Sequence, residues 1–502
     1  MNFEKLLNGK ILDPIHGTIR LTELEINVIN HRLFQRLRTV KQNSFLYKVF
    51  PSAMHSRFEH SIGVMHVAYR MLENLIINSY RYDAKYDDDL LYPELDKIPD
   101  SFVQELRLAA LLHDLGHGPM SHQFDSFLFS KDELQDYLGN EYADVYELIN
   151  DDEGVEHEHI SLIFIKKVIK DLGAENTVCV DNILSLIDTS YGGRNFRIET
   201  SCGEHDLHPL LTSLISSSPI DSDRMDYLLR DSYFSGVRSG IYNLERLLSS
   251  VIPVKVEDKV CLAYKESSID SISEFVFSRM NLFSQVYYHK TNRAFSSMLS
   301  TACQLIKEKY GDETSSKTFK STENHKGIES LENFYLDNSD DYFINDTVPR
   351  LVEGIPHAEH LINSIVERKP WKKIFEFKHY APGTIQNAVN KGFVEKLRSD
   401  LEKLALDDLN SNEFIVDIAT DNAFKDLHKT QVHLLKKSFN GNYELAHISD
   451  CGEKLDIYQS IRYFVRVFVS PELALGTKKA AFQQKLSEFT KKTFEEISQQ
   501  VK

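Results

Sequence analysis

The chain has 502 residues, of which 42% are hydrophobic, enough to build a full core. Its 58 basic and 75 acidic residues give a net charge of -17, which argues against a surface that coats nucleic acid and leaves room only for a local basic pocket. The five cysteines show no CxxC spacing, the first ten residues lack the apolar core of a signal peptide, and no run of about 18 apolar residues occurs. These features exclude zinc-finger, disulfide-framework and membrane-spanning proteins and predict a cytoplasmic one.

The first elements are predicted near the N-terminus. A turn at Asp13-Pro14 leads into a short strand at residues 19–21. Thr22 precedes Glu25 by three residues, which is the spacing of a capping box, so we expect a helix to begin there. The charged side chains that follow this helix are expected on a solvated face, and these are Arg36 and Arg38.

A second helix is predicted after the aromatic loop that contains Pro51. It begins near Ser56 and places Arg57, His60 and Val64 on one face. An arginine and a histidine one turn apart suit a site that holds both a cation and an anion. The alternative is a partly buried helix whose histidine only caps a neighbouring element.

The densest group of chemically active residues lies between residues 106 and 125. The segment begins as an amphipathic helix with Leu106, Ala110 and His113 on one stripe, and it breaks at the sequence GHGP. Three histidines and two aspartates lie within thirteen residues around this break, namely His113, Asp114, His117, His122 and Asp125. A buried His-Asp pair can be purely structural, but three histidines around a glycine-rich break have no obvious packing use.

Another helix is predicted for residues 221–231. Asp223, Tyr227 and Asp231 recur every four residues and therefore line one of its faces. Asp226 and Arg230 fit a plain i,i+4 ion pair on the surface. Surface pairing does not explain the Asp-Tyr-Asp stripe.

Two further helical segments carry polar groups. Residues 151–171 predict a helix in which His157 precedes an apolar run. Residues 271–302 predict one long helix or two, with a cluster of polar and aromatic side chains inside it, Tyr287, Tyr288, His289 and Lys290. Core packing explains the tyrosines better than it explains His289 and Lys290.

After about residue 310 the chain becomes polar and turn-rich, which indicates a surface loop. Beyond it, helices are predicted at residues 392–406 and 479–501, and strands at 413–419 and 462–469. This pattern predicts a mixed α/β appendage. No catalytic constellation is evident there.

The separated polar residues can be assembled into one ligand set. His60, His113, Asp114 and Asp223 lie on three predicted helices and offer imidazole and carboxylate ligands. Such a set suits iron, manganese, zinc or another divalent ion. Open positions on the ion would hold water and a phosphate oxygen.

Five motifs of the chain resemble those of a known family. The motifs that carry the resemblance are DPIHG at residues 13–17, FQRLR at 34–38, RFEHSIGV at 57–64, HDLGHGPMSH at 113–122 and DRMDYLLRD at 223–231. In this order they are similar to those of the HD-domain deoxynucleoside triphosphate (dNTP) triphosphohydrolases. The resemblance covers roughly residues 10 to 300 and, more faintly, 462–471. It implies a mainly α fold with an HD-domain catalytic core in residues 1–310. From its position alone, we expect the C-terminal α/β region in residues 311–502 to serve oligomerisation and regulation.

The resemblance also implies roles for individual residues. The metal ligands would be His60, His113, Asp114 and Asp223. The catalytic and phosphate-facing cluster would be His117, His122, Asp125 and His157, with one of these as the general acid. Contacts to the phosphates and the deoxyribose would come from Gln42, Arg57, Arg224, Tyr227, Asp231 and Lys290. An allosteric nucleotide would meet Lys10, Gln35 and Arg38.

The implied reaction is attack of water at the α-phosphorus of a dNTP, which releases a deoxynucleoside and inorganic triphosphate. The implied cofactor is a divalent ion (Mn, Fe, Zn or Mg), with Mg also on the triphosphate. The implied partners are a dNTP substrate, a nucleotide activator and further copies of the chain in a tetramer or hexamer. Neither a membrane nor a nucleic acid is expected as a partner.

Three positions depart from the family pattern. Leu12 stands in place of an asparagine and Asn30 in place of an aspartate that reads guanine, which weakens the case for a GTP-specific activator site. Asn43 stands in place of a leucine near the sugar, so sugar discrimination is expected to differ. Two alternatives stay open. One is another HD phosphohydrolase, acting on a deoxynucleoside monophosphate, a cyclic nucleotide or (p)ppGpp. The other is a non-catalytic nucleotide sensor.

Overall fold

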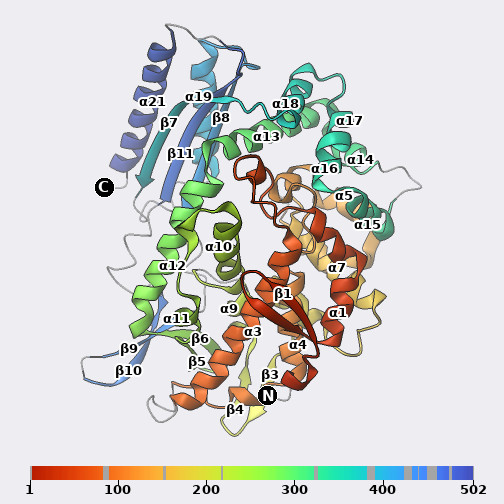
Figure 1. The fold of residues 1–502 in the computed structure, drawn as a ribbon, viewed down its shortest axis with the longest axis vertical. Helices are drawn as coiled ribbons and strands as arrows, with labels where there is room; N and C mark the ends of the chain where they lie inside the picture. Colours follow the sequence, from red (N-terminus) through yellow and green to blue (C-terminus); the bar gives the residue numbers. More distant parts are fainter. Residues whose placement is uncertain are drawn as a thin grey trace.

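The computed structural model describes residues 3–82, 90–150, 154–215, 219–320, 326–381, 391–422, 432–438, 440–448, 461–473 and 478–500. Helices dominate it, which confirms the mainly α class (Figure 1). Its α-helices are α1 (Glu23–Asn30), α2 (Arg32–Gln35), α3 (Arg57–Arg81), α4 (Asp100–Leu112), α5 (Lys131–Leu138), α6 (Ala143–Tyr146), α7 (His157–Asp171), α8 (Val180–Ile187), α9 (His208–Ile215), α10 (Ser222–Ser235), α11 (Leu244–Leu248), α12 (Ile269–Leu282), α13 (Lys290–Tyr310), α14 (Thr314–Thr318), α15 (Ile328–Asp337), α16 (Asp340–Tyr342), α17 (Val348–Val352), α18 (Pro356–Val366), α19 (Lys391–Leu406) and α21 (Lys478–Gln500).

The strands of the described residues form three sheets. They are β1 (Gly9–Asp13), β2 (Gly17–Leu21), β3 (Arg197–Thr200), β4 (Gly203–Asp206), β5 (Val251–Val256), β6 (Lys259–Lys265), β7 (Lys372–Ala381), β8 (Phe414–Asn422), β9 (His433–Lys437), β10 (Tyr443–His447) and β11 (Ile461–Val469). Strands β1 and β2 form a hairpin, β10-β9-β6-β4-β3 form a sheet in which β5 also pairs with β6, and β7-β11-β8 form an antiparallel sheet. Figure 1 shows the β9-β10 hairpin beside β5 and β6, well away from the β7-β11-β8 sheet.

Helix α3 is the centre of the N-terminal half of the chain, because it packs against both α4 and α10. It begins where the sequence predicts, with Ser56 as its N-cap and Glu59 completing a capping box. Helix α1 likewise begins after the predicted capping box of Thr22 and Glu25. Local hydrogen bonds therefore set where both helices start.

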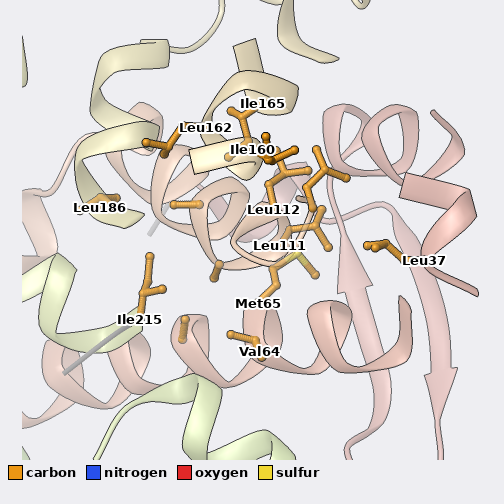
Figure 2. Close-up of a cluster of buried hydrophobic side chains, with 14 of the residues drawn as sticks. Leu37, Val64, Met65, Leu111, Leu112, Ile160, Leu162, Ile165, Leu186 and Ile215 are labelled. Atoms are coloured by element: carbon orange, nitrogen blue, oxygen red, sulfur yellow. The ribbon is translucent and has the colours of Figure 1, made fainter. Parts of the chain in front are cut away.

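The core around α3 and α4 is apolar and fully buried. Met65 of α3 and Leu111 and Leu112 of α4 meet Ile160 of α7, and Figure 2 shows their side chains converging from these separate helices. Burial of such side chains is the main stabilising contribution to a fold, roughly 1.5–3 kcal/mol for each one. Because Leu112 directly precedes His113, this core also fixes the end of α4.

Two glycines allow the close approaches that the site needs. A Cβ atom at Gly116 would overlap the backbone of His157 and Ser161, so glycine lets the end of α4 touch the start of α7. A Cβ atom at Gly63 would overlap the carboxylate of Asp226, so glycine lets α10 approach α3.

The hydrophobic core around α3 continues past residue 310. Leu331 of α15, Leu361 of α18 and Trp371 belong to it. A second core lies between the β7-β11-β8 sheet and helices α19 and α21. The division of the chain at residue 310 stays a prediction.

The predicted elements of the C-terminal region are present. Helices α19 and α21 and strands β8 and β11 occupy the predicted stretches, apart from Val501, which lies outside the described residues, as do residues 151–153 of the predicted helix that contains His157. None of the described helices is both long and apolar enough to cross a membrane.

Candidate functional site

The structure brings the four predicted metal ligands together. His60 comes from α3, His113 and Asp114 from the end of α4, and Asp223 from the first turn of α10. His60 Nε2 lies 3.0 Å from a carboxylate oxygen of Asp223 and 3.6 Å from one of Asp114, and His113 Nε2 lies 3.4 Å from Asp114. Ligand atoms of His60, His113 and Asp114 all lie within 4.8 Å of one another, close enough to share one ion.

The two histidines are oriented for metal binding. His60 Nδ1 lies 2.8 Å from Asp226, and His113 Nδ1 lies 2.9 Å from the carbonyl oxygen of Ala110. Both Nε2 atoms therefore face the carboxylates, which is how metal-ligating histidines are held in proteins. His113 Nε2 is buried and has no hydrogen-bond partner among the described residues, as expected of a nitrogen atom that binds a cation. The residues present fit a divalent ion.

The charges at this point also favour a cation. Burial alone would raise the pKa of Asp114, but Arg57, with His113 and His117, holds it well below its usual range. Burial likewise opposes ionisation of Asp223, yet the His60 contact lowers its pKa. Burial acts to lower the pKa of His60, and its hydrogen bonds to Asp223 and Asp226 outweigh this and raise the pKa to about 10. The carboxylates thus attract positive charge to their centre.

Asp226 supports this arrangement, a role that its place in the sequence did not predict. The predicted i,i+4 ion pair with Arg230 is present, but its expected surface location is wrong, because both side chains are fully buried. Arg230 donates from Nε and Nη2 to both Asp226 oxygens, at 2.8 and 2.9 Å, and from Nη1 to Asp13 at 2.8 Å. His16 Nε2 lies 2.7 Å from Asp226. The DPIHG motif therefore supports the carboxylate that orients His60.

The second predicted cluster lies beside the first. The rings of His117 and His157 stack with centroids 3.6 Å apart, and His122 lies 4.8 and 4.9 Å from them. An oxygen of Asp125 lies 3.1 Å from His157 Nδ1 and 3.6 Å from His122 Nδ1. His117 Nε2 lies 3.3 Å from Asp114, so the two clusters are continuous.

The stacked histidines have opposite pKa shifts. Burial, with the positive charges of Arg57 and His157, lowers the pKa of His117 well below its ordinary value. Burial also acts against protonation of His157, but Asp125 and Glu158 raise its pKa. Titratable groups whose surroundings push their pKa values apart suit acid and base roles.

Arg36 supports this cluster from behind. It was expected on a solvated face, which is wrong, because its guanidinium is buried. It donates to the carbonyl oxygens of His117, at 2.8 Å, and of Leu115, and it lies over the ring of Tyr335. These bonds fix the backbone that carries His117.

Both clusters open into one cavity of about 460 Å³. Of the predicted site residues, its walls contain Gln42, Arg57, His113, Asp114, His117, His122, His157, Asp223, Tyr227 and Asp231. The cavity is also lined by Tyr287 and Tyr288, which lie between α12 and α13, and by Asn292 and Arg293 at the start of α13. The Asp-Tyr-Asp stripe of α10 therefore faces a cavity, as its spacing predicts.

Asp231, on the α10 side of the cavity, has three hydrogen-bond partners. His55 Nε2 lies 2.6 Å from one carboxylate oxygen, while Asn43 donates to the other at 2.9 Å and the Tyr287 hydroxyl donates to the same oxygen. Burial opposes its ionisation, but these bonds lower its pKa. Gln42 Oε1, also in the wall, is buried with no partner among the described residues.

Seven predicted residues are not part of the cavity wall: His60 and Asp125, which contact residues of the wall, and Arg224, Lys290, Lys10, Gln35 and Arg38. Arg224 pairs with Asp221, and Lys290 lines a different hollow beside Trp371, so the geometry does not support either as a phosphate contact in this cavity. Arg38 donates to Gln35 at 2.9 Å and stacks on Phe58. Lys10 is exposed on β1. An activating nucleotide at Lys10, Gln35 and Arg38 stays a prediction.

Comparisons with known proteins agree with this geometry. Residues 57–228 match the model of the HD domain family. The chain is 30% identical over 298 residues to the "Deoxynucleoside triphosphate triphosphohydrolase SAMHD1 homolog" of Dictyostelium discoideum (59% of this chain, 49% of that protein) and 26% identical over 419 residues to the Homo sapiens protein named SAMHD1 (81% and 62%). It is 31% identical over 313 residues to the uncharacterized YwfO of Bacillus subtilis (61% and 59%).

A solved structure extends the comparison to the fold. A hypothetical protein from Aquifex aeolicus superposes with a TM-score of 0.61 at 23% identity, covering 94% of this chain and 99% of that one, which shows a shared fold. The chain spans about half the length of the first curated relatives that it matches.

The fold and the histidine-aspartate site define an HD-domain protein of the phosphohydrolase type. Within that class, the chain is similar to the proteins named deoxynucleoside triphosphate triphosphohydrolases over more than half of its length.

Proposed function

We propose that the chain hydrolyses dNTPs at the α-phosphorus and releases a deoxynucleoside and inorganic triphosphate. The observation that carries this proposal is one cavity that joins a cluster able to hold a metal ion, a histidine-aspartate cluster and the polar wall around Asp231. The Dictyostelium and human relatives are named deoxynucleoside triphosphate triphosphohydrolases, which supports the choice of substrate.

The first requirement is to hold a strongly charged substrate. Arg57 and Arg293 line the cavity, and each is anchored by a carboxylate, Asp114 and Asp417 respectively. Anchored guanidinium groups stabilise phosphate charge without reorganising during the reaction. A divalent ion held by His60, His113, Asp114 and Asp223 would polarise a phosphate oxygen and so favour attack by water.

The second requirement is a proton for the leaving group. When water attacks the α-phosphorus, the bond to the 5′-oxygen breaks, and that oxygen needs a proton to leave as the hydroxyl of the deoxynucleoside. His122 and His157 share Asp125, and His122 is exposed towards the cavity. We assign the proton donor to this pair, in which Asp125 stabilises the charged imidazole.

The third requirement is recognition of the sugar. Asp231 already accepts hydrogen bonds from His55, Asn43 and Tyr287, and a carboxylate has about four acceptor positions. One position remains for a substrate hydroxyl, which we assign to the 3′-hydroxyl. Tyr227 beside it would pack under the deoxyribose.

Product analysis tests this proposal. Purified protein is incubated with each dNTP and with GTP, singly and mixed, with Mn²⁺ or Mg²⁺, and the products are separated by ion exchange. We expect a deoxynucleoside and intact triphosphate, and turnover confined to mixtures would indicate an activating nucleotide. Asp114→Ala should lose this activity, whereas Asp346→Asn, an exposed acid paired with Arg350, should keep it. A nucleoside monophosphate with pyrophosphate, or no product in any mixture, would contradict the proposal.

A further inference from the structure

A carboxylate from the C-terminal region lies behind the cavity. Asp340, the first residue of α16, is 2% exposed. It accepts hydrogen bonds from the backbone N–H of Met120, at 2.6 Å, and from that of Lys41, at 2.9 Å. The two donors are 79 residues apart in sequence and about 220 and 299 residues from Asp340. One side chain thus joins three distant segments.

Both donors directly precede residues of the cavity wall. Lys41 precedes Gln42, and Met120 precedes Ser121 and His122. Met120 and Ser121 have φ values of 65° and 54°, the left-handed region that non-glycine residues rarely adopt. Two such residues in succession persist only where surrounding contacts hold them.

Further hydrogen bonds connect the two segments bound by Asp340 to an arginine of the site. The Ser121 hydroxyl donates to the carbonyl oxygen of Lys41 at 2.8 Å and accepts from Arg57 Nε at 2.9 Å. The Ser44 hydroxyl donates to the carbonyl oxygen of Met120 at 2.6 Å. Arg57 in turn donates to Asp114. A continuous path of hydrogen bonds therefore joins Asp340 to the metal-ligand cluster.

We propose that Asp340 is a positioning residue for the hydrolysis: its carboxylate clamps the Met120 and Lys41 amides, and so sets the turn that aligns Ser121, His122 and Arg57. This inference rests on the proposed function, because hydrolysis of a dNTP is the reaction that Asp340 assists. A carboxylate can accept from both N–H groups, whereas an amide of the same shape has one oxygen and would turn its NH₂ group towards the second donor. Asparagine is therefore the discriminating substitution.

The surroundings of Asp340 agree with an ionised clamp at neutral pH. Burial raises its pKa to about 6, while the two backbone hydrogen bonds and Lys41 act in the opposite direction. The charged groups that face it are Lys41, whose Nζ lies 3.8 Å away, and the exposed Asp341, which lies 3.6 Å from that same Nζ. Asp341 accepts neither amide bond, so Asp341→Asn is a matched control.

The test compares Asp340→Asn with wild type and Asp341→Asn in the full chain. We expect Asp340→Asn to lower kcat at least tenfold, with KM for the dNTP and the affinity for Mn²⁺ within threefold of wild type. A clamp that only stabilises the fold would lower the melting temperature and leave kcat of the folded protein unchanged, and this result would overturn the proposal. Product analysis of the wild type shows separately whether triphosphate is released. Failure of the proposed function is therefore distinguished from failure of the Asp340 proposal.

Two measurements keep the proposal testable if Asp340→Asn does not fold. Selective ¹⁵N labelling of the eight methionines should show a strongly deshielded Met120 amide proton, as expected of a short bond to a carboxylate. Ser121→Ala removes the hydroxyl between Lys41 and Arg57, and it should also lower kcat at least tenfold at unchanged Mn²⁺ affinity. An ordinary Met120 shift, or full kcat in Ser121→Ala, would refute the clamp.

Discussion

His60 Nδ1 lies 2.8 Å from a buried oxygen of Asp226, and this contact turns His60 Nε2 towards Asp114 and Asp223. The orientation of a metal ligand is therefore set by a residue that faces away from the cavity. Asp226 is held in turn by Arg230 and His16, so the N-terminal hairpin and α10 both contribute to the metal site.

Asp226→Asn should weaken metal binding. The substitution keeps the shape of the side chain but removes the charge that orients His60, and loss of such a partner typically costs 10–100-fold in metal affinity. Titration of metal-free protein with Mn²⁺ by calorimetry measures this, with Asp346→Asn as the exposed control. His16→Gln should give a smaller loss. Wild-type affinity in Asp226→Asn, with an unchanged circular dichroism spectrum, would contradict the role of this contact.

Arg36→Lys should reduce both stability and turnover. Lysine cannot donate to the carbonyl oxygens of His117 and Leu115 in the same geometry, and an unsatisfied buried carbonyl costs about 1–3 kcal/mol. Thermal denaturation and kcat measure the two effects. Arg350→Lys, in an exposed ion pair with Asp346, should change neither. Equal melting temperatures and equal kcat for the two lysine variants would contradict this role of the Arg36 hydrogen bonds.

Asp231→Asn should raise KM for substrates that carry a 3′-hydroxyl, by about 10–100-fold, because a buried acceptor for that hydroxyl is weakened. The matched comparison is a 2′,3′-dideoxynucleoside triphosphate, which lacks the hydroxyl and should be nearly insensitive to the substitution. Steady-state kinetics on both substrates decide the matter. Equal losses would mean that Asp231 supports the wall through His55 and Tyr287 without touching the sugar.

Acidification should destabilise the fold through His66. Burial, with the positive charges of His16, Arg70 and Arg107, lowers its pKa to about 3, whereas an unfolded histidine titrates near 6.5. The unfolded chain then binds more protons between these values, so stability is lost as pH falls below about 6.5.

Between pH 7 and pH 5 this loss should be on the order of 1–2 kcal/mol. Other groups titrate in the same range, so the measurement is the difference in unfolding free energy between wild type and His66→Gln at each pH. The variant should lose less stability on acidification. Parallel profiles for the two proteins would rule out His66 as the cause.

The features that sequence predicts here are those set by neighbouring residues. The capping boxes of Thr22 and Ser56 act over three residues, and the Asp223-Tyr227-Asp231 spacing fixes a helix face whatever surrounds it. The candidate metal ligands were predicted because histidine and aspartate in the HD pattern have few structural uses. Sequence therefore predicted the mainly α class, and it grouped four candidate ligands, His60, His113, Asp114 and Asp223, that lie close together in the fold.

The features that sequence did not predict depend on distant contacts. Asp226 and Arg230 have the same spacing whether the pair is exposed or buried, and only packing against Gly63 of α3 decides between the two. Arg36 follows a helix end like any surface arginine, and Tyr335, about 300 residues later, buries it. Asp340 belongs to a region with no visible constellation, because its partners are backbone amides, which leave no mark in a sequence.

The measurement that tests the central claim most directly is hydrolysis of a dNTP in H₂¹⁸O, with mass spectrometry of both products. Attack of water on the α-phosphorus with cleavage of the bond to the 5′-oxygen predicts one ¹⁸O atom in the inorganic triphosphate and none in the deoxynucleoside. Label in the 5′-hydroxyl of the deoxynucleoside, or in a nucleoside monophosphate, would contradict this account of the site.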